Sequence, residues 1–118
     1  MRRILVVNDS EIRPITARLL EIRGYTVDMA DDGFDVIEHL TRDEYDAVVL
    51  DVTMPRVNGR GVLVHLARTN PTMIGRTVLV ASVAEEAVES QLNEIVRVLV
   101  KPFAIGDLLD AIEECAAA

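Results

Sequence analysis

The sequence predicts an α/β protein with one open, doubly wound parallel sheet of five strands, each followed by a helix. Short aliphatic runs alternate five times with segments of helical periodicity, and parallel strands need such crossover helices between them. A closed barrel of eight such units needs about 250 residues, far more than the 118 of this chain. No repeat, low-complexity tract or linker-like stretch divides the chain, so we expect residues 1–118 to form a single domain.

The expected strands are nearly continuous runs of aliphatic and β-branched residues. Such runs are typical of parallel strands that are covered by helices on both faces. They span residues 3–7, 25–29, 47–50, 77–80 and 98–100. The second run alternates apolar and polar residues, so we expect it nearer an edge of the sheet.

Apolar residues at helical spacing follow each of these runs. In the first helix they recur from Ile12 to Ile22, with Ser10 as the expected N-cap and Gly24 as the stop. The second helix follows the acidic pair Asp31-Asp32, whose carboxylates favour a helix start. The apolar positions of the other helices fall at residues 62–66, 88–95 and 108–115. Cys115 belongs to the last of these stripes and is expected to be a small buried residue.

The composition argues against several classes of function. With 20 acidic and 12 basic side chains, the formal charge is −8, so we expect no direct binding to nucleic acid or to an anionic membrane surface. No apolar stretch approaches the roughly 18 to 20 residues of a membrane-spanning helix. The N-terminus also lacks the apolar core of a signal peptide, which favours a soluble, cytoplasmic chain. The single cysteine excludes an internal disulfide and a cysteine-based metal site.

Polar residues follow four of the five expected strands, at the edge where open α/β sheets bind their ligands. They are Asn8 and Asp9 after the first strand, Asp51 after the third, Ser82 after the fourth and Lys101 after the fifth. Two carboxylates form a hard oxygen site suited to Mg²⁺. An ammonium and a hydroxyl are suited to a phosphoryl group. The residues themselves therefore indicate Mg²⁺-dependent phosphoryl chemistry at this edge.

Two longer motifs identify a family. They are Leu50-Asp51-Val-Thr-Met-Pro55, with Gly59 eight residues past the aspartate, and Val100-Lys101-Pro102-Phe103. From Arg3 to Cys115 the chain resembles the receiver domains of bacterial two-component response regulators. The resemblance implies a flavodoxin-like, CheY-like fold with strand order 2-1-3-4-5.

The resemblance also implies a phosphoacceptor and its metal site. Asp51 would accept a phosphoryl group from a sensor histidine kinase or a histidine phosphotransfer protein. Asp9, Asp51 and the backbone carbonyl of Thr53 would bind Mg²⁺, with Asn8 as a weakened outer position. No organic cofactor is expected, and the only catalysis expected is self-phosphorylation and autodephosphorylation at Asp51.

The remaining residues of the family pattern form a switch. Lys101 would pair with the phosphoryl group, and Ser82 would hydrogen-bond it. Movement of Ser82 would shift the face formed by the fourth helix, fifth strand and fifth helix, and so change the binding of a downstream protein.

Three positions and one spacing depart from the family pattern. Asn8 replaces the first acidic residue after strand one, Val83 replaces the usual alanine or glycine, and Val98 replaces a common aromatic. Ser82 and Lys101 are separated by 101 − 82 = 19 positions, so the fourth helix is expected to be short or displaced.

These departures leave open a second hypothesis, a pseudo-receiver that binds proteins independently of phosphorylation. A third hypothesis is an aspartyl phosphatase. It is disfavoured because that class needs a carboxylate where Thr53 stands, and Cys115 lacks a phosphate loop for cysteine-based catalysis.

Overall fold

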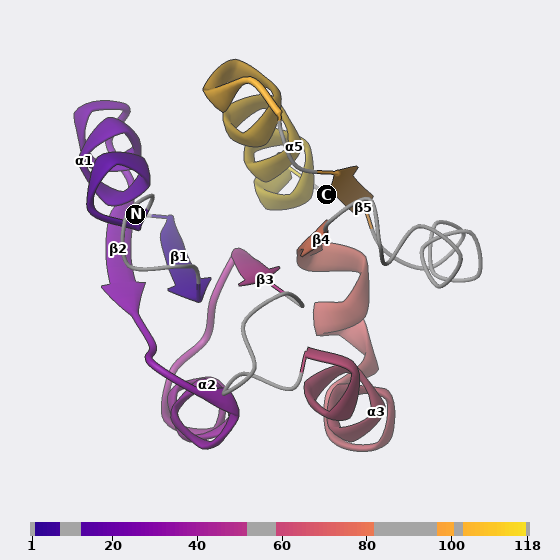
Figure 1. Ribbon diagram of the computed structural model, residues 1–118. Coiled ribbons are helices and arrows are strands. Elements are labelled where there is room, and N and C mark those ends of the chain that lie inside the picture. The colour runs from indigo at the N-terminus through magenta and orange to yellow at the C-terminus, as the bar shows by residue number, and fades with distance from the viewer. Residues whose placement is uncertain (1, 8–12, 52–58, 82–96, 101–102, 118) are drawn as a thin grey trace.

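The structure is a computed structural model that describes residues 2–7, 13–51, 59–81, 97–100 and 103–117. Five parallel strands form one sheet in the order β2-β1-β3-β4-β5, as Figure 1 shows. The predicted fold class and strand order are confirmed. The strands are β1 (Arg3–Val7), β2 (Thr26–Met29), β3 (Ala47–Asp51), β4 (Thr77–Ala81) and β5 (Arg97–Val100).

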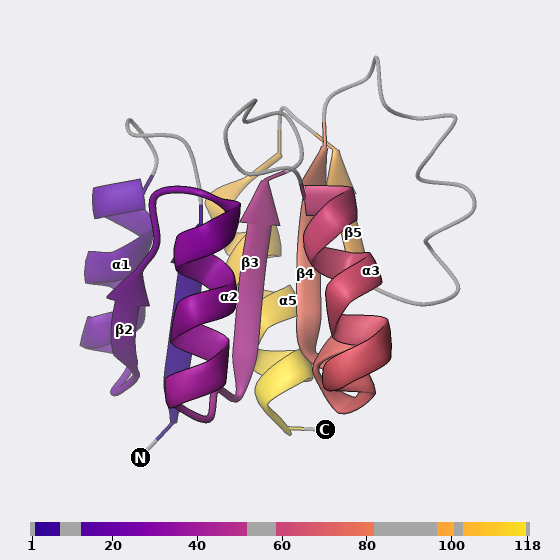
Figure 2. The same ribbon diagram turned by 90° about the horizontal axis from the view of Figure 1, so that it is seen from below.

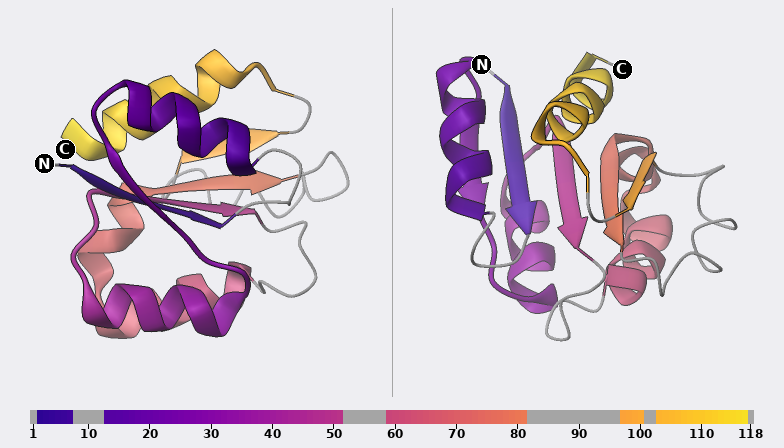
Figure 3. Two further views of the ribbon diagram at one scale, coloured as in Figure 1. Left: turned by 90° about the vertical axis from the view of Figure 1, so that its left-hand side faces the viewer. Right: turned by 45° about the horizontal axis from the view of Figure 1, so that its top comes forward.

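Helices cover both faces of this sheet. Those described are α1 (Arg13–Ile22), α2 (Gly33–Arg42), α3 (Gly59–Thr69), the 3₁₀ helix η1 (Pro71–Arg76) and α5 (Ile105–Ala117). The helices α1 and α5 lie on one face, and α2 and α3 lie on the other (Figure 3). The expected helix around residues 88–95 and the expected cap Ser10 lie outside the described residues.

The sheet separates two hydrophobic cores, because successive side chains of a strand point to opposite faces. On β1, Leu5 and Val7 pack in the core beneath α2 and α3. Ile4 and Val6 pack in the core beneath α1 and α5, which also holds Cys115. These five residues are fully buried, as predicted for Cys115 and for a strand with helices on both faces.

Two helix ends are set by the residues that the sequence predicts for them. Gly24 has φ of 93°, and its amide donates to the Glu21 carbonyl while the next amide, from Tyr25, donates to Leu20. This is the Schellman arrangement, in which glycine adopts a left-handed conformation at low cost. At the start of α2, the Asp32 carboxylate accepts a hydrogen bond from the Asp35 amide and caps the helix.

The 3₁₀ helix η1 is an element that the sequence pattern does not predict. It follows Asn70 and begins at Pro71, and its one buried side chain, Met73, joins the core beneath α2 and α3. Six residues with a single buried position give too little periodicity to identify a helix. Its carbonyl at Met73 accepts a 2.7 Å hydrogen bond from the buried Thr77 hydroxyl, which ties η1 to β4.

Candidate functional site

The candidate site lies at the carboxyl edge of the sheet, where β1, β3, β4 and β5 end. The strand registers pair Val7 with Leu50, Asp51 with Val80, and Ala81 with Val100, so the four ends lie at one edge. Figure 2 shows all strands running toward that edge, while the described ends of the chain lie at the opposite one. The predicted convergence of strand ends is therefore confirmed.

Asp51 is the last residue of the central strand, β3. Its backbone pairs with β4, and the neighbouring Leu50 pairs with β1, so strands on both sides hold its main chain. Leu50 and Val80 are fully buried beside it. The main chain of Asp51 is therefore held between two neighbouring strands, and its side chain lies outside what the structure describes.

The other predicted site residues follow three of these strand ends directly in sequence. Asn8 and Asp9 come after Val7, Ser82 comes after Ala81, and Lys101 comes after Val100. These four residues lie outside the described residues, as do Thr53 and Val83. Their roles stay predictions, although the strands that precede them have the predicted order.

Val98 is the one departure from the family pattern whose surroundings are described. It is half-buried on β5, pairs with Leu79 of β4 and packs against the core beneath α2 and α3. A valine at this position has a short side chain that is confined to staggered rotamers by its β-branch. No ring at this position can rotate between an outward and an inward orientation.

The acidic start of α2 also lies near the carboxyl edge, just after β2 ends. Asp32 caps the helix, and the Asp35 carboxylate accepts a 3.0 Å hydrogen bond from the Asp31 amide. The Asp35 carbonyl and carboxylate also lie 2.8 and 3.2 Å from His39 Nδ1. These contacts confirm the interpretation of Asp31 and Asp32 as a helix start, add Asp35 to it, and place His39 against its own helix.

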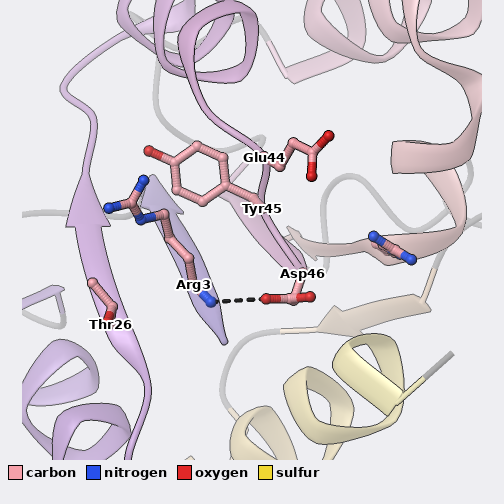
Figure 4. A pocket seen from close by; sticks show the side chains of 6 residues that line it. Arg3, Thr26, Glu44, Tyr45 and Asp46 are labelled. Atoms are coloured by element: carbon pink, nitrogen blue, oxygen red, sulfur yellow. Dashed lines mark hydrogen bonds between the residues drawn. The ribbon is translucent and has the colours of Figure 1, made fainter. Parts of the chain in front are cut away.

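A cavity of about 370 Å³ lies at the opposite, amino edge of the sheet. Figure 4 shows Arg3, Thr26, Glu44, Tyr45 and Asp46 around it, with the hydrogen bond from the Arg3 amide to Asp46 drawn dashed. The rule that ligands bind beyond the carboxyl ends of strands does not predict this cluster, because its residues lie at the amino ends. Polar residues at the starts of the strands are the sequence signal that could have indicated this cluster.

Ion pairs and hydrogen bonds dominate this amino-edge cluster. The Arg3 guanidinium lies 3.1 Å from Asp43 and 3.7 Å from Asp28, and the Tyr45 hydroxyl donates a 2.6 Å hydrogen bond to Asp28. Burial, and then the hydrogen bond and the negative charge of Asp28, raise the pKa of Tyr45 well above its ordinary value. These contacts join β1, β2 and the segment before β3, so we interpret the cluster as structural.

Two further features concern metals and membranes. The described ranges contain no group of three or more histidine, cysteine, aspartate or glutamate side chains placed to hold a metal ion. None of the described helices has the length and hydropathy needed to cross a membrane.

Comparison with known proteins places this architecture in a family. The profile described as "Response regulator receiver domain" matches residues 4–113. The chain is 35% identical over 109 residues to the response regulator MprA of Mycobacterium leprae, covering 92% of this chain and 48% of that protein. It thus spans about half the length of this curated relative.

Two solved structures share the fold at high coverage. A CheY-like receiver domain protein from Methanospirillum hungatei is 26% identical, with a TM-score of 0.83 over 99% of this chain and 94% of that one. The response regulator TrrA from Thermotoga maritima, solved in complex with Mg²⁺-BeF, is 25% identical, with a TM-score of 0.77 over 98% and 99%. The strand order, the convergent strand ends and the matched profile together show that the chain belongs to the response regulator receiver domains, the signalling modules of two-component systems.

Proposed function

We propose that this receiver domain accepts a phosphoryl group on Asp51 from a phosphohistidine of a sensor kinase or a phosphotransfer protein. The observation that carries the proposal is the position of Asp51 at the end of the central strand, with the ends of β1 and β4 beside it. A carboxylate oxygen of Asp51 forms the new bond to phosphorus as the bond from phosphorus to the histidine nitrogen breaks. Hydrolysis of the resulting acyl phosphate returns the free carboxylate.

The donor set fits a magnesium ion. Asp9 and Asp51 would supply carboxylate oxygens and Thr53 its backbone carbonyl, which are hard donors of the kind that Mg²⁺ binds. When bound, the ion would neutralise negative charge on the phosphoryl oxygens. The Mg²⁺-BeF complex of TrrA supports this assignment by similarity.

Asn8 is expected to weaken metal binding because it removes one negative charge from this set. At about 4 Å a unit charge contributes roughly 1 kcal/mol in a water-like environment and about 4 kcal/mol in a more buried one. We therefore expect a higher magnesium requirement for phosphorylation than in receivers with an acidic residue at this position. Asn8 still offers an amide oxygen to a water molecule of the metal.

Lys101 and Ser82 complete the proposed chemistry on the phosphoryl oxygens. The ammonium of Lys101, the only lysine among 12 basic residues, would neutralise one oxygen, and the Ser82 hydroxyl would donate a hydrogen bond to another. Movement of Ser82 toward the phosphoryl group would alter the face that includes β5 and α5. A downstream protein would bind that altered face, without direct contact with nucleic acid, in the cytoplasm.

One observation favours a second candidate function, a pseudo-receiver that binds its partner without phosphorylation. Val98 is half-buried against the core where the family commonly has an aromatic, so rotation of a ring cannot report on the site. Asn8 and Val83 also favour this function. Asn8 removes one negative charge from the proposed metal site, and the bulk of Val83 would narrow the approach to Asp51.

Mass spectrometry separates the two functions. After incubation with a phosphohistidine donor and Mg²⁺, we expect an adduct of about 80 Da, the mass of one phosphoryl group. Asp51→Asn should abolish it, and Asp32→Asn, which keeps a capping side chain, should retain it. A chain that gains no adduct at saturating Mg²⁺ is a pseudo-receiver, and an adduct that survives Asp51→Asn refutes the assignment of Asp51.

A further inference from the structure

The amino edge of the sheet has a second cavity, of about 460 Å³, beside the cavity of about 370 Å³ that Arg3 lines. Glu44, Tyr45 and Arg76 line both cavities, which together are named here the amino-edge groove. Side chains from the end of α2, from the segment before β3 and from η1 line the second cavity. The proposed phosphoryl chemistry lies at the opposite edge of the sheet and uses none of these residues.

One side of the amino-edge groove is formed by groups that already bind one another. The Arg3 guanidinium lies 3.1 Å from Asp43, and the Arg3 amide donates a 2.8 Å hydrogen bond to the Asp46 carboxylate. The Tyr45 hydroxyl also has a carboxylate partner. Figure 4 shows the Glu44 carboxylate on the far side of the Tyr45 ring from the Arg3 guanidinium. These groups therefore hold that side of the groove in place, and Glu44 stands apart from them.

The other side of the groove carries charged and polar side chains whose binding capacity is unused. Glu44 and Arg76 form no ion pair with each other or with any other residue in the described ranges. Asn70 precedes η1, but its side chain makes no capping hydrogen bond. Arg76 and Asn70 are half-buried. A half-buried guanidinium without an anion has lost part of its hydration and gained no opposite charge, so an anionic group would bind it favourably.

These side chains together specify the chemistry of a ligand. The planar guanidinium of Arg76 matches a carboxylate, and the side-chain amide of Asn70 can donate a further hydrogen bond to it. Glu44 attracts a cationic group, and the side chains of Leu40 and Met73 add apolar atoms to the same groove. We propose that the amino-edge groove binds an α-amino acid with an aliphatic side chain, with the ligand carboxylate on Arg76 and the ligand ammonium on Glu44.

The charges and size of the groove favour this class over other small molecules. An anion such as inorganic phosphate would be attracted by Arg76 but repelled by Glu44, and a simple cation would experience the reverse. Arg42 also lines the groove, but it already lies 3.8 Å from Glu38 of its own helix. A ligand that carries both charges satisfies both free groups. The two cavities fall in the range of about 300 to 1,000 Å³ that is typical of small-molecule sites.

Binding should be weak, because polar side chains form most of the groove and the ligand has few atoms. We expect a dissociation constant of roughly 0.1 to 5 mM for L-leucine. An NMR titration of the whole chain, with L-leucine from about 0.1 to 50 mM, covers that range. At about pH 6.5 the ligand ammonium is charged. The amide signals of residues 40–46 and 70–76 should shift with one common dissociation constant.

Two analogues and two variants test which residue binds which end of the ligand. N-acetyl-L-leucine lacks the ammonium and L-leucinamide lacks the carboxylate, so each should bind at least about fivefold more weakly than L-leucine. Glu44→Gln should remove the preference for L-leucine over N-acetyl-L-leucine, and Arg76→Gln should remove the preference over L-leucinamide. The matched controls Arg18→Gln and Glu21→Gln lie at exposed positions of α1, across the sheet from the groove, and should bind like the unchanged chain.

The proposal is overturned if L-leucine at the highest concentration shifts none of these amide signals. It is equally overturned if Glu44→Gln or Arg76→Gln keeps the preferences of the unchanged chain. Glu44 is exposed, so at least this variant is expected to fold, and circular dichroism verifies the fold of each variant. The titration needs no phosphoryl donor, so its failure does not bear on phosphoryl transfer to Asp51.

Discussion

Replacement of threonine by valine should have opposite effects on stability at two fully buried positions. Thr16 on α1 and Thr77 at the start of β4 are both 0% exposed. The Thr77 hydroxyl donates a 2.7 Å hydrogen bond to the Met73 carbonyl, whereas the Thr16 hydroxyl has no hydrogen-bond partner among the residues that the structure describes. Valine has nearly the shape of threonine, so Thr→Val at each position removes one hydroxyl without opening a cavity.

The magnitudes follow from the state of each hydroxyl. An unsatisfied buried polar group costs about 1–3 kcal/mol, so Thr16→Val should raise the free energy of unfolding by about 1–2 kcal/mol. Thr77→Val loses a hydrogen bond that the folded chain makes, so it should lower that free energy by about 1 kcal/mol. Each kcal/mol corresponds to a shift in Tm of about 3–6 °C for a chain of this size.

Urea unfolding followed by circular dichroism measures both changes, with a constant m-value as the check that the unfolded state is unaffected. Thr41→Val is the matched control, since Thr41 is exposed and its hydroxyl bonds only its own helix, to Ile37. It should change stability by less than about 0.5 kcal/mol. The reasoning is refuted if Thr16→Val destabilises the chain as much as Thr77→Val does.

Three other substitutions test the contacts that position the sheet. Tyr45→Phe removes a hydrogen bond to the Asp28 carboxylate and should cost about 1–2 kcal/mol in urea unfolding. The pKa of Tyr45 is raised in the folded chain, so the contribution of its hydrogen bond to stability is complete below the ordinary pKa of 10 and is lost as the pH rises above that value. The free energy of unfolding of Tyr45→Phe should therefore fall less steeply at alkaline pH than that of the unchanged chain. Gly24→Ala should lower Tm, because a φ of 93° strains an alanine by about 1 kcal/mol or more. Gly75→Ala is the control and should leave Tm unchanged, because Gly75 has open space around it and no positive φ. Equal effects of the two substitutions would contradict the assignment of Gly24 as the helix cap. Asp32→Ala removes the cap of α2 and should cost about 0.5–2 kcal/mol in thermal unfolding, and an unchanged Tm would show that the cap is dispensable.

The strands could be predicted to within a residue or two because burial on both faces leaves long aliphatic runs. Of the residues expected in strands, only Tyr25 lies outside one: it precedes β2 and is buried. The helix ends at Gly24 and Asp32 could also be predicted, since one needs a left-handed residue and the other a side-chain acceptor. In contrast, η1 has one buried residue, Met73, and no period from which to infer it.

Of the two polar clusters at the edges of the sheet, only the one at the carboxyl edge could be predicted from the sequence. That the ends of four strands converge follows from parallel topology, and the registers at Leu50, Asp51 and Ala81 confirm it. The amino-edge cluster could not be predicted by that rule. Arg3 and Asp28 are 25 positions apart, and no local pattern indicates that a guanidinium from one strand meets a carboxylate from its neighbour.

The two edges of the sheet therefore have separable energetic roles. At the amino edge, Arg3, Asp28 and Tyr45 satisfy one another's charges and hydrogen bonds, so this edge contributes to stability. At the carboxyl edge, β3 is fully buried up to Leu50 and ends at Asp51, the residue for which we propose a role in phosphoryl transfer. A substitution at the amino edge should lower Tm and leave the rate of phosphorylation unchanged while the chain is folded. Asp51→Asn should instead raise Tm or leave it unchanged, because it removes one negative charge from a chain of net charge −8. It should abolish phosphorylation, because it replaces the proposed phosphoacceptor. A variant pair that fails to separate in this way would show that the edges are coupled through the sheet.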